Sequence, residues 1–220
     1  EKIAETLYKN GADELIFIDT VASLYQRNNL IEVIRNSSKK IFIPLTVGGG
    51  IKNLKDIYDL LRAGADKVAI NTYATKNRNF ITKAAKEFGS QCIVLFVQAK
   101  LINNEYFCLT DNSRENSGLK VTNWIQAAEE LGAGEILLSS VDKDGAKSGY
   151  DYNLINDVLR ISNLPIIPHG GCGKNLDIYN LIIKNKKLNA VSLSSHLYSN
   201  KLDVKKIKNF LNKKRIKIRK

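Results

Sequence analysis

The sequence predicts an α/β fold, a (β/α)8 TIM barrel made of two half-barrels, and three observations lead to this prediction. Apolar β-rich runs alternate with segments of helical periodicity along the whole chain. The same landmarks return at one interval, since Pro44 and Pro165 are 165 − 44 = 121 residues apart. Each proline lies in an apolar run, and glycines follow that run. We therefore expect a single barrel domain over residues 1–220, with half-barrels at about 1–90 and 91–204 and a basic segment at 205–220.

The repeat extends well beyond the glycine segments. The segment GADELIFIDT beginning at Gly11 matches GAGEILLSSV beginning at Gly132, and the triplet DIY at 56–58 recurs at 177–179. The run KVAINT also matches NAVSLSS, with a small insertion. Four landmarks in the same order and at near-constant spacing favour a duplication over chance. A period of this length differs from the short repeats of solenoids.

The first half alternates helices and strands in order. The segment EKIAETLYKNG has helical periodicity and ends at a glycine, and ELIFIDT is a continuous β-rich run typical of a strand covered on both faces. We then expect a helix near 29–35, the strand IFIPLTV, a helix near 54–63 and the strand KVAIN.

The second half repeats this alternation. We expect the strand CIVLFVQ, an irregular stretch with EYFCLT, the helix VTNWIQAAEELG, the strand EILLSS, a helix near 153–160, the strand LPIIPH, the helix LDIYNLIIKN and the strand AVSLS. These make seven strands in all. The counterpart of CIVLFVQAK would fall before residue 1, so we expect the first barrel strand to be missing from this chain. An open doubly wound sheet is the alternative, but two matching halves argue against it.

Composition is that of an ordinary globular protein, at 44% hydrophobic and 25% charged residues. The longest apolar runs, such as CIVLFV, are too short to span a membrane, and no signal segment opens the sequence. The three cysteines are odd in number and lack metal-binding spacing, which favours reduced thiols in a cytoplasmic protein. The sequence has no methionine, so we do not expect residue 1 to be a translation start.

The net charge of +12 is concentrated at one end. Nine lysines and arginines and no acidic residue lie between Lys205 and Lys220. Such a tail can bind nucleic acid, or it can be a solvated terminal helix. We favour the helix and expect no nucleic-acid partner, because no nucleic-acid motif accompanies the tail. The positive charge would still attract a phosphorylated substrate.

The working residues of such barrels lie where strands end, so the duplication predicts two equivalent anion pockets. The first pocket would combine the glycines at 48–50 with Asn71 and Thr72. The second would combine the glycines at 170–171 with Ser194 and Ser195. Glycines allow backbone amides to approach an anion, although they also serve in tight turns. Two pockets related by duplication predict a ligand with a phosphate at each end.

Five segments carry a closer likeness: FIPLTVGGGI, LLRAGADKVAINT, FGSQCIV, LGAGEILLSSVDKDGAKSGYD and GGCGK. They cover nearly the whole chain, which resembles the cyclase subunit of imidazole glycerol phosphate synthase, of histidine biosynthesis. The resemblance implies a barrel of two half-barrels without a cofactor. It also implies a heterodimer with a glutaminase, whose ammonia passes through the barrel. The bisphosphate substrate would be an N-ribulosyl formimino aminoimidazole carboxamide ribotide, converted by lysis and cyclisation.

The same resemblance assigns the phosphates to particular residues. One phosphate would lie on Gly50, Asn71 and Thr72. The other would lie on Asp144, Gly145, Gly171, Ser194 and Ser195. His169 stands where the family usually has serine, so it would either contact this phosphate or crowd the pocket, and His196 would pack at the barrel rim.

The family's proton transfers are performed by two aspartates, and this chain departs from that pattern. The first aspartate would lie upstream of residue 1, as would a loop that closes on the substrate. The second aligns with Gln98, whose amide cannot transfer a proton near neutral pH. Asp19 at the end of FIDT could orient the ligand or act as an acid, or be a strand-end carboxylate satisfied by backbone donors. Asp142 and Asp144 lie in the loop after EILLSS.

Three charged residues, Glu14, Lys67 and Glu135, begin strands at the opposite end of the barrel. Buried charges require partners, and three of alternating sign can satisfy one another. By resemblance they belong to a gate for ammonia, and Asp66 belongs to the glutaminase interface. Ordinary surface ion pairing is the alternative. The combination of Gln98 with a complete set of these gate residues also leaves open a second function. The chain could be an ammonia-conducting or docking subunit for a glutaminase that serves another amidotransferase, such as one acting on sugars.

Overall fold

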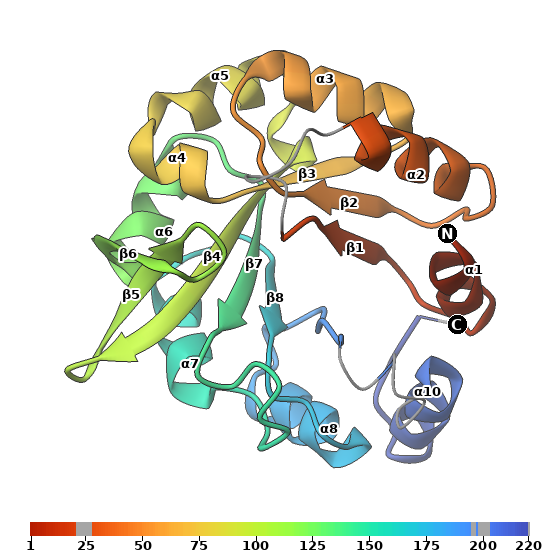
Figure 1. Ribbon diagram of the computed structural model, residues 1–220. Coiled ribbons are helices and arrows are strands. Elements are labelled where there is room, and N and C mark those ends of the chain that lie inside the picture. The colour runs from red at the N-terminus through yellow and green to blue at the C-terminus, as the bar shows by residue number, and fades with distance from the viewer. Residues whose placement is uncertain (21–27, 195–196, 198–202, 220) are drawn as a thin grey trace.

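The protein folds around a curved sheet with its helices on the outer side (Figure 1). This computed structural model describes residues 1–20, 28–194, 197 and 203–219. Six parallel strands follow the order β1-β2-β3-β4-β7-β8, and β5 and β6 extend from β4 as an antiparallel hairpin. The strands are β1 (Leu15–Ile18), β2 (Leu45–Gly48), β3 (Lys67–Ile70), β4 (Ile93–Ile102), β5 (Glu105–Thr110), β6 (Glu115–Lys120), β7 (Glu135–Ser140) and β8 (Ile166–His169).

Helices connect the parallel strands, as strict alternation requires. They are α1 (Lys2–Lys9), α2 (Asn28–Ser38), α3 (Leu54–Ala63), α4 (Thr72–Lys76), α5 (Asn79–Phe88), α6 (Val121–Glu130), α7 (Tyr152–Ile161), α8 (Asn175–Lys184) and α10 (Val204–Lys213). The basic segment thus begins as a helix, which lies near the β1 end of the sheet (Figure 1). Lys208 Nζ of this helix lies 2.7 Å from Oδ1 of Asp13, in the connection between α1 and β1. No helix in the described part of the chain has the length and apolar character needed to cross a membrane.

The duplication predicted from the sequence is confirmed in the strand register. β1 pairs with β2 from Leu15↔Leu45 to Ile18↔Gly48, and β7 pairs with β8 from Ile136↔Ile166 to Ser139↔His169. Every pair in the second set lies 121 residues after its counterpart in the first. The bounds of α3 and α8 differ by the same interval. The two halves therefore share one backbone arrangement, as expected for a barrel of two half-barrels.

The duplicated helices also begin in the same way. Asp56 Oδ2 accepts the backbone N–H groups of Lys52 and Asn53, at 2.7 and 3.3 Å. Asp177 Oδ2 accepts those of Gly173 and Lys174, at 2.8 and 3.0 Å. Each carboxylate lies in the first helical turn, where it satisfies amides that have no helical partner and opposes the positive end of the helix dipole.

Alternation along the strands separates two apolar layers. A small cluster fills the inner side of the curved sheet, and a larger one packs the helices against the outer side. The inner cluster consists of Ala69, Val94, Leu137 and Ile167, with Ile16, Ile18 and Phe96 against it. Because side chains alternate between faces, residues two positions further along these strands also face the interior. This places Asn71, Gln98, Ser139 and His169 at the mouth of the barrel.

Two expectations from the sequence are wrong, and both concern which segments pair as strands in the sheet. The stretch around EYFCLT is not irregular. It forms the hairpin β5–β6, and β4 reaches β5 through a turn in which Asn103 and Asn104 have φ of 49° and 63°. Residues 190–194 do not form the expected strand. Ser192 N–H donates to the Pro168 carbonyl at 2.9 Å, but a single bond to β8 is not a ladder.

Helices α4 and α5 fill the connection between β3 and β4, which the sequence prediction left without a helix. Phe80, Ile81 and Ala84 are buried on α5, so its apolar residues do follow helical spacing. Three lysines lie within and around this segment, at 76, 83 and 86, and gave it a polar appearance.

The equivalent starts of α3 and α8 can be compared by measuring how much each carboxylate contributes to the free energy of unfolding. We expect Asp56→Ala and Asp177→Ala each to lower the free energy of unfolding by about 1–2 kcal/mol. Asp177 should cost more, because it is buried and its removal leaves two amides with less access to water. Urea unfolding followed by circular dichroism measures both. Asp157→Ala, on a surface ion pair of α7, is the control and should change stability by less than ~0.5 kcal/mol. A larger loss for Asp56→Ala than for Asp177→Ala would contradict this interpretation.

Candidate functional site

Two glycines allow the chain to approach a neighbouring strand end, once in each half. Gly49 has φ of 112°, and a β-carbon there would overlap the Asp19 carbonyl oxygen. Gly170 has φ of 94°, and a β-carbon there would lie 2.9 Å from the Ser140 carbonyl oxygen. Gly170 and Ser140 each lie 121 residues after Gly49 and Asp19. The same close approach therefore occurs at two places on the same end of the sheet.

The second pocket brings together four of the five residues predicted for it. Asp144, Gly145, Gly171 and Ser194 line one cavity, and the fifth, Ser195, lies outside the described residues, as does His196. Lys147 also lines the cavity and was not predicted, although the run KDGAKSG contains it. Its lining thus includes glycine backbone, a hydroxyl and a cation, the kinds of group that bind a phosphate, together with the Asp144 carboxylate, which does not.

His169 lies in the wall of the second pocket. Its Nδ1 is 3.1 Å from Ser192 Oγ, and its Nε2 is 3.8 Å from Asp144 Oδ1. Burial lowers the pKa of the imidazole, and the Asp144 carboxylate opposes this shift only in part. The ring is therefore neutral at neutral pH and can serve this pocket as a hydrogen-bond donor rather than as a cation.

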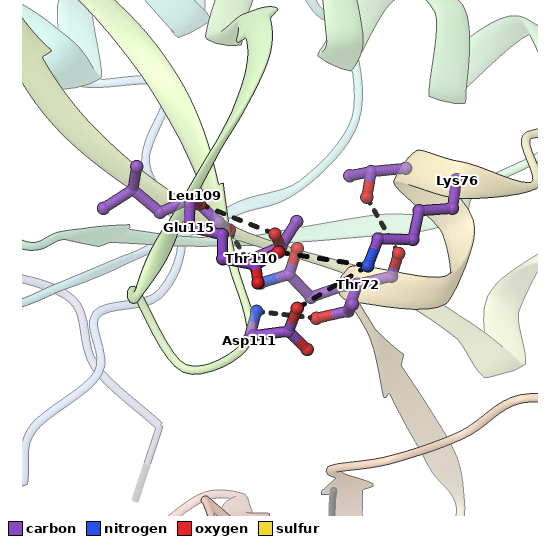
Figure 2. Close-up of polar contacts among 8 residues, drawn as sticks. Thr72, Lys76, Leu109, Thr110, Asp111 and Glu115 are labelled. Atoms are coloured by element: carbon purple, nitrogen blue, oxygen red, sulfur yellow. Dashed lines mark hydrogen bonds and ion pairs between the residues drawn. The ribbon is translucent and has the colours of Figure 1, made fainter.

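The first pocket is bordered by the hairpin β5–β6. Thr72 Oγ1 accepts the Asp111 N–H at 3.0 Å (Figure 2). Asn71 Nδ2 donates to the Leu109 carbonyl at 3.1 Å. The Lys76 ammonium lies 3.6 Å from Asp111 and 4.0 Å from Glu115. Gly50 follows β2, the strand beside β3, and its φ is 58°. Sequence reasoning missed the hairpin's part in this pocket.

Gln98 and Asp19 occupy different parts of the barrel mouth. Gln98 Oε1 accepts from Asn71 Nδ2 at 3.0 Å. Asp19 follows β1, which is separated from β4 by β2 and β3, and its N–H donates to the Gly48 carbonyl at 2.9 Å. Asp142 accepts the Leu101 N–H at 2.8 Å and so ties its loop to β4. Among the residues that the structure describes, no carboxylate lies in hydrogen-bond contact with Gln98.

The three gate residues meet at the opposite end of the barrel. Lys67 Nζ lies 3.1 Å from Glu14 Oε2 and 2.8 Å from Glu135 Oε2. Lys67 and Glu135 begin β3 and β7, and Glu14 directly precedes β1. Neither β1 nor β7 pairs with β3, so the ion pairs cross the interior. Burial opposes the charged ammonium, but the hydrogen bonds and charges of Glu135 and Glu14 outweigh it and raise the pKa of Lys67.

Asp66, the predicted interface residue, is engaged within the chain. Its Oδ2 accepts the Leu45 N–H at 2.8 Å, and its own N–H donates to the Leu45 carbonyl at 2.8 Å. These two bonds join the starts of β2 and β3. The residue is nevertheless exposed at the gate end of the barrel, beside Lys67.

A buried network supports the hairpin from the other side. Asp151 is 9% exposed and accepts from Ser140 Oγ and from the Tyr106 hydroxyl, both at 2.8 Å. Burial and the Asp151 carboxylate raise the pKa of Tyr106, which therefore remains a donor. The bond attaches β5 to the start of α7. No local sequence signal pairs Tyr106 with Asp151, because 45 residues separate them.

Comparisons with known proteins agree with this geometry. A family model described as "Histidine biosynthesis protein" matches residues 1–203. Three similar relatives are each named imidazole glycerol phosphate synthase subunit HisF. The Legionella pneumophila protein is 51% identical over 78% of this chain and 81% of its own length. The Natranaerobius thermophilus protein is 41% identical over 99% and 86%, and that of Prochlorococcus marinus strain AS9601 is 45% identical over 95% and 82%.

The match covers most of the chain and of each relative, and it includes both glycine approaches and all three gate residues. The chain therefore belongs to the histidine biosynthesis protein family, in which it resembles the cyclase subunit of imidazole glycerol phosphate synthase.

Proposed function

We propose that this chain is a cytoplasmic cyclase subunit of imidazole glycerol phosphate synthase that binds a glutaminase subunit as a heterodimer. It would use ammonia from that partner to convert the ribulosyl-formimino aminoimidazole carboxamide bisphosphate to imidazole glycerol phosphate and an aminoimidazole carboxamide ribotide. The observation that carries the proposal is the duplicated glycine approach at Gly49 and Gly170. It supports the proposal of two anion pockets at one end of the barrel, as a ligand with two phosphates would require.

In this proposal each pocket holds one phosphate. Gly50, Asn71 and Thr72 serve the first pocket, and the second is served by Asp144, Gly145, Gly171, Ser194 and Ser195. The neutral His169 and the Lys147 ammonium add donors to the second. Binding both ends of the substrate fixes its centre over the barrel axis, which converts binding energy into orientation of the reacting atoms.

Ammonia would enter at the other end. Glu14, Lys67 and Glu135 surround the axis there, and the apolar inner cluster lies between them and the mouth. An apolar interior favours neutral ammonia over ammonium, because burial of an unpaired cation is costly. Asp66, exposed at this end, would lie in the glutaminase interface.

A second function is favoured by one observation, the amide of Gln98 at the position of a family aspartate. A docking subunit would accept ammonia at the gate and deliver it to another enzyme without proton transfer at residue 98. On the cyclase hypothesis Asp19 is a candidate acid or orienting group, and it lies across β2 and β3 from Gln98. Measuring turnover of the bisphosphate with ammonium salts separates the two functions, because only a cyclase would convert this substrate.

We expect Gln98→Asp in the full-length protein to raise kcat for cyclisation with ammonium as the nitrogen source by at least ~10²-fold. A positioned general acid or base typically contributes about this much, and glutamine supplies none. Steady-state kinetics on the purified variant measure it. Gln126→Glu, an exposed change on α6, controls for added negative charge. An unchanged kcat would favour the docking function.

The gate gives a separate prediction. We expect Lys67→Met to lower glutamine-dependent turnover in the glutaminase complex by roughly tenfold, a barrier of about 1.4 kcal/mol, while ammonium-dependent turnover changes by less than about twofold. In the variant the charged Lys67 side chain is lost, so the carboxylates of Glu14 and Glu135 repel each other across the passage. Lys55→Met, which removes an ion pair on the outer helix α3, is the control. Equal loss with both nitrogen sources would show that Lys67 has no specific part in ammonia transfer.

A further inference from the structure

Gln98 lies at the barrel mouth on β4, between β3 and β7 in the sheet and beyond the inner apolar cluster. It follows Val94 and Phe96 on the inward-facing positions of β4. Its neighbours in the sheet are Leu109 on β5 and Ser139 on β7. A ligand bridging the two pockets would pass over this position.

Only one assignment of donors and acceptors satisfies the hydrogen bonds around Gln98. The Leu109 carbonyl can only accept, so the Asn71 atom 3.1 Å away must be the amide nitrogen. That nitrogen also lies 3.0 Å from the Gln98 amide and donates there as well, so the Gln98 atom facing it must be the oxygen. A backbone carbonyl of the hairpin thus determines the orientation of the Gln98 side chain.

Two consequences follow for the donors at the mouth. Both amide hydrogens of Asn71 are used, one by Leu109 and one by Gln98, so Asn71 is a positioning residue here and would have to give up one of these bonds to donate its side chain to a phosphate. The Gln98 amide nitrogen, in contrast, donates no hydrogen bond to any residue in the described ranges. The residue is partly exposed, and we expect a ligand at the mouth to reach this nitrogen.

We infer that Gln98 is a specificity-determining residue that presents a fixed N–H donor to a hydrogen-bond acceptor, such as a carbonyl oxygen, at the centre of the bound ligand. The inference rests on the proposed function, since it concerns the same bisphosphate site. A carboxylate at this position would offer acceptors and transfer a proton, whereas the amide offers donors and transfers none. The site is therefore selective for a ligand whose central group accepts a hydrogen bond.

The first test needs no ligand. In ¹⁵N-resolved NMR spectra of the full chain, the side-chain amide hydrogens of Asn71 should exchange with water more slowly than those of Gln98. Spectra of Gln98→Glu and Asn71→Asp assign the two signals by difference. Slow exchange at Gln98 together with fast exchange at Asn71 would reverse the direction of the hydrogen bonds and overturn the inference.

The second test compares two substitutions by calorimetric titration with the bisphosphate substrate. Gln98→Met removes both the donor and the acceptor, whereas Gln98→Glu keeps the acceptor for Asn71 and loses only the donor. A donor role predicts that Gln98→Met weakens binding about tenfold, the effect of roughly one hydrogen bond, and that Gln98→Glu weakens it further because its charge faces the ligand's acceptor. A merely structural role predicts the opposite order, with Gln98→Glu close to wild type.

Gln126→Glu serves again as the charge-matched control and should bind like wild type. Equal binding by all four proteins would overturn the inference while leaving the proposed function in place. Failure of the wild type itself to bind the bisphosphate would instead remove the proposed function, and the exchange rates of Asn71 and Gln98 would then decide the inference alone. Since Gln98→Asp also loses the donor, its KM should rise even where its kcat increases.

Discussion

The close approach of one strand end to the next, through a glycine at position 49 and again at position 170, is the constraint on which the site depends. A β-carbon at either position would overlap or crowd the carbonyl of Asp19 or Ser140. Both glycines have positive φ, which side chains rarely adopt. The geometry directs the following backbone toward the barrel mouth, where its amides can meet an anion. Because the strand registers of the two halves are identical, the two proposed anion pockets would lie at equivalent places on the same rim.

The strand β3 connects the two ends of the barrel. Lys67 begins it within the gate, Ala69 lies in the apolar layer, and Asn71 follows it at the mouth. Alternation places these three residues on one side of the strand at successive depths. The charge network, the apolar passage and the polar mouth are therefore one stack of inward-facing residues. The hairpin β5–β6 closes one side of the stack by holding Asn71 and Thr72.

Much of this arrangement could be predicted from the sequence, and the exceptions have physical reasons. The spacing of the glycines and of Glu14 and Glu135 identified the duplication, because each copy retains its landmarks. Local periodicity predicted six of the strands and the helices α3 and α6 closely. The hairpin was missed because its pairing depends on a two-asparagine turn and on Asp151, 45 residues from Tyr106. Residues 190–194 had strand composition, but composition does not supply a hydrogen-bonded partner. The direction of the Gln98 amide depends on the Leu109 carbonyl, which no pattern in the sequence reports.

Whether the duplicated halves bind a doubly anionic ligand is decided most directly by a crystal structure of the full-length protein with the bisphosphate substrate. The duplication predicts one phosphate beside Gly50 and Thr72 and the other beside Gly171 and Ser194, at equivalent places in the two halves. Phosphates found on the basic C-terminal helix, or a single phosphate in only one half, would contradict the account.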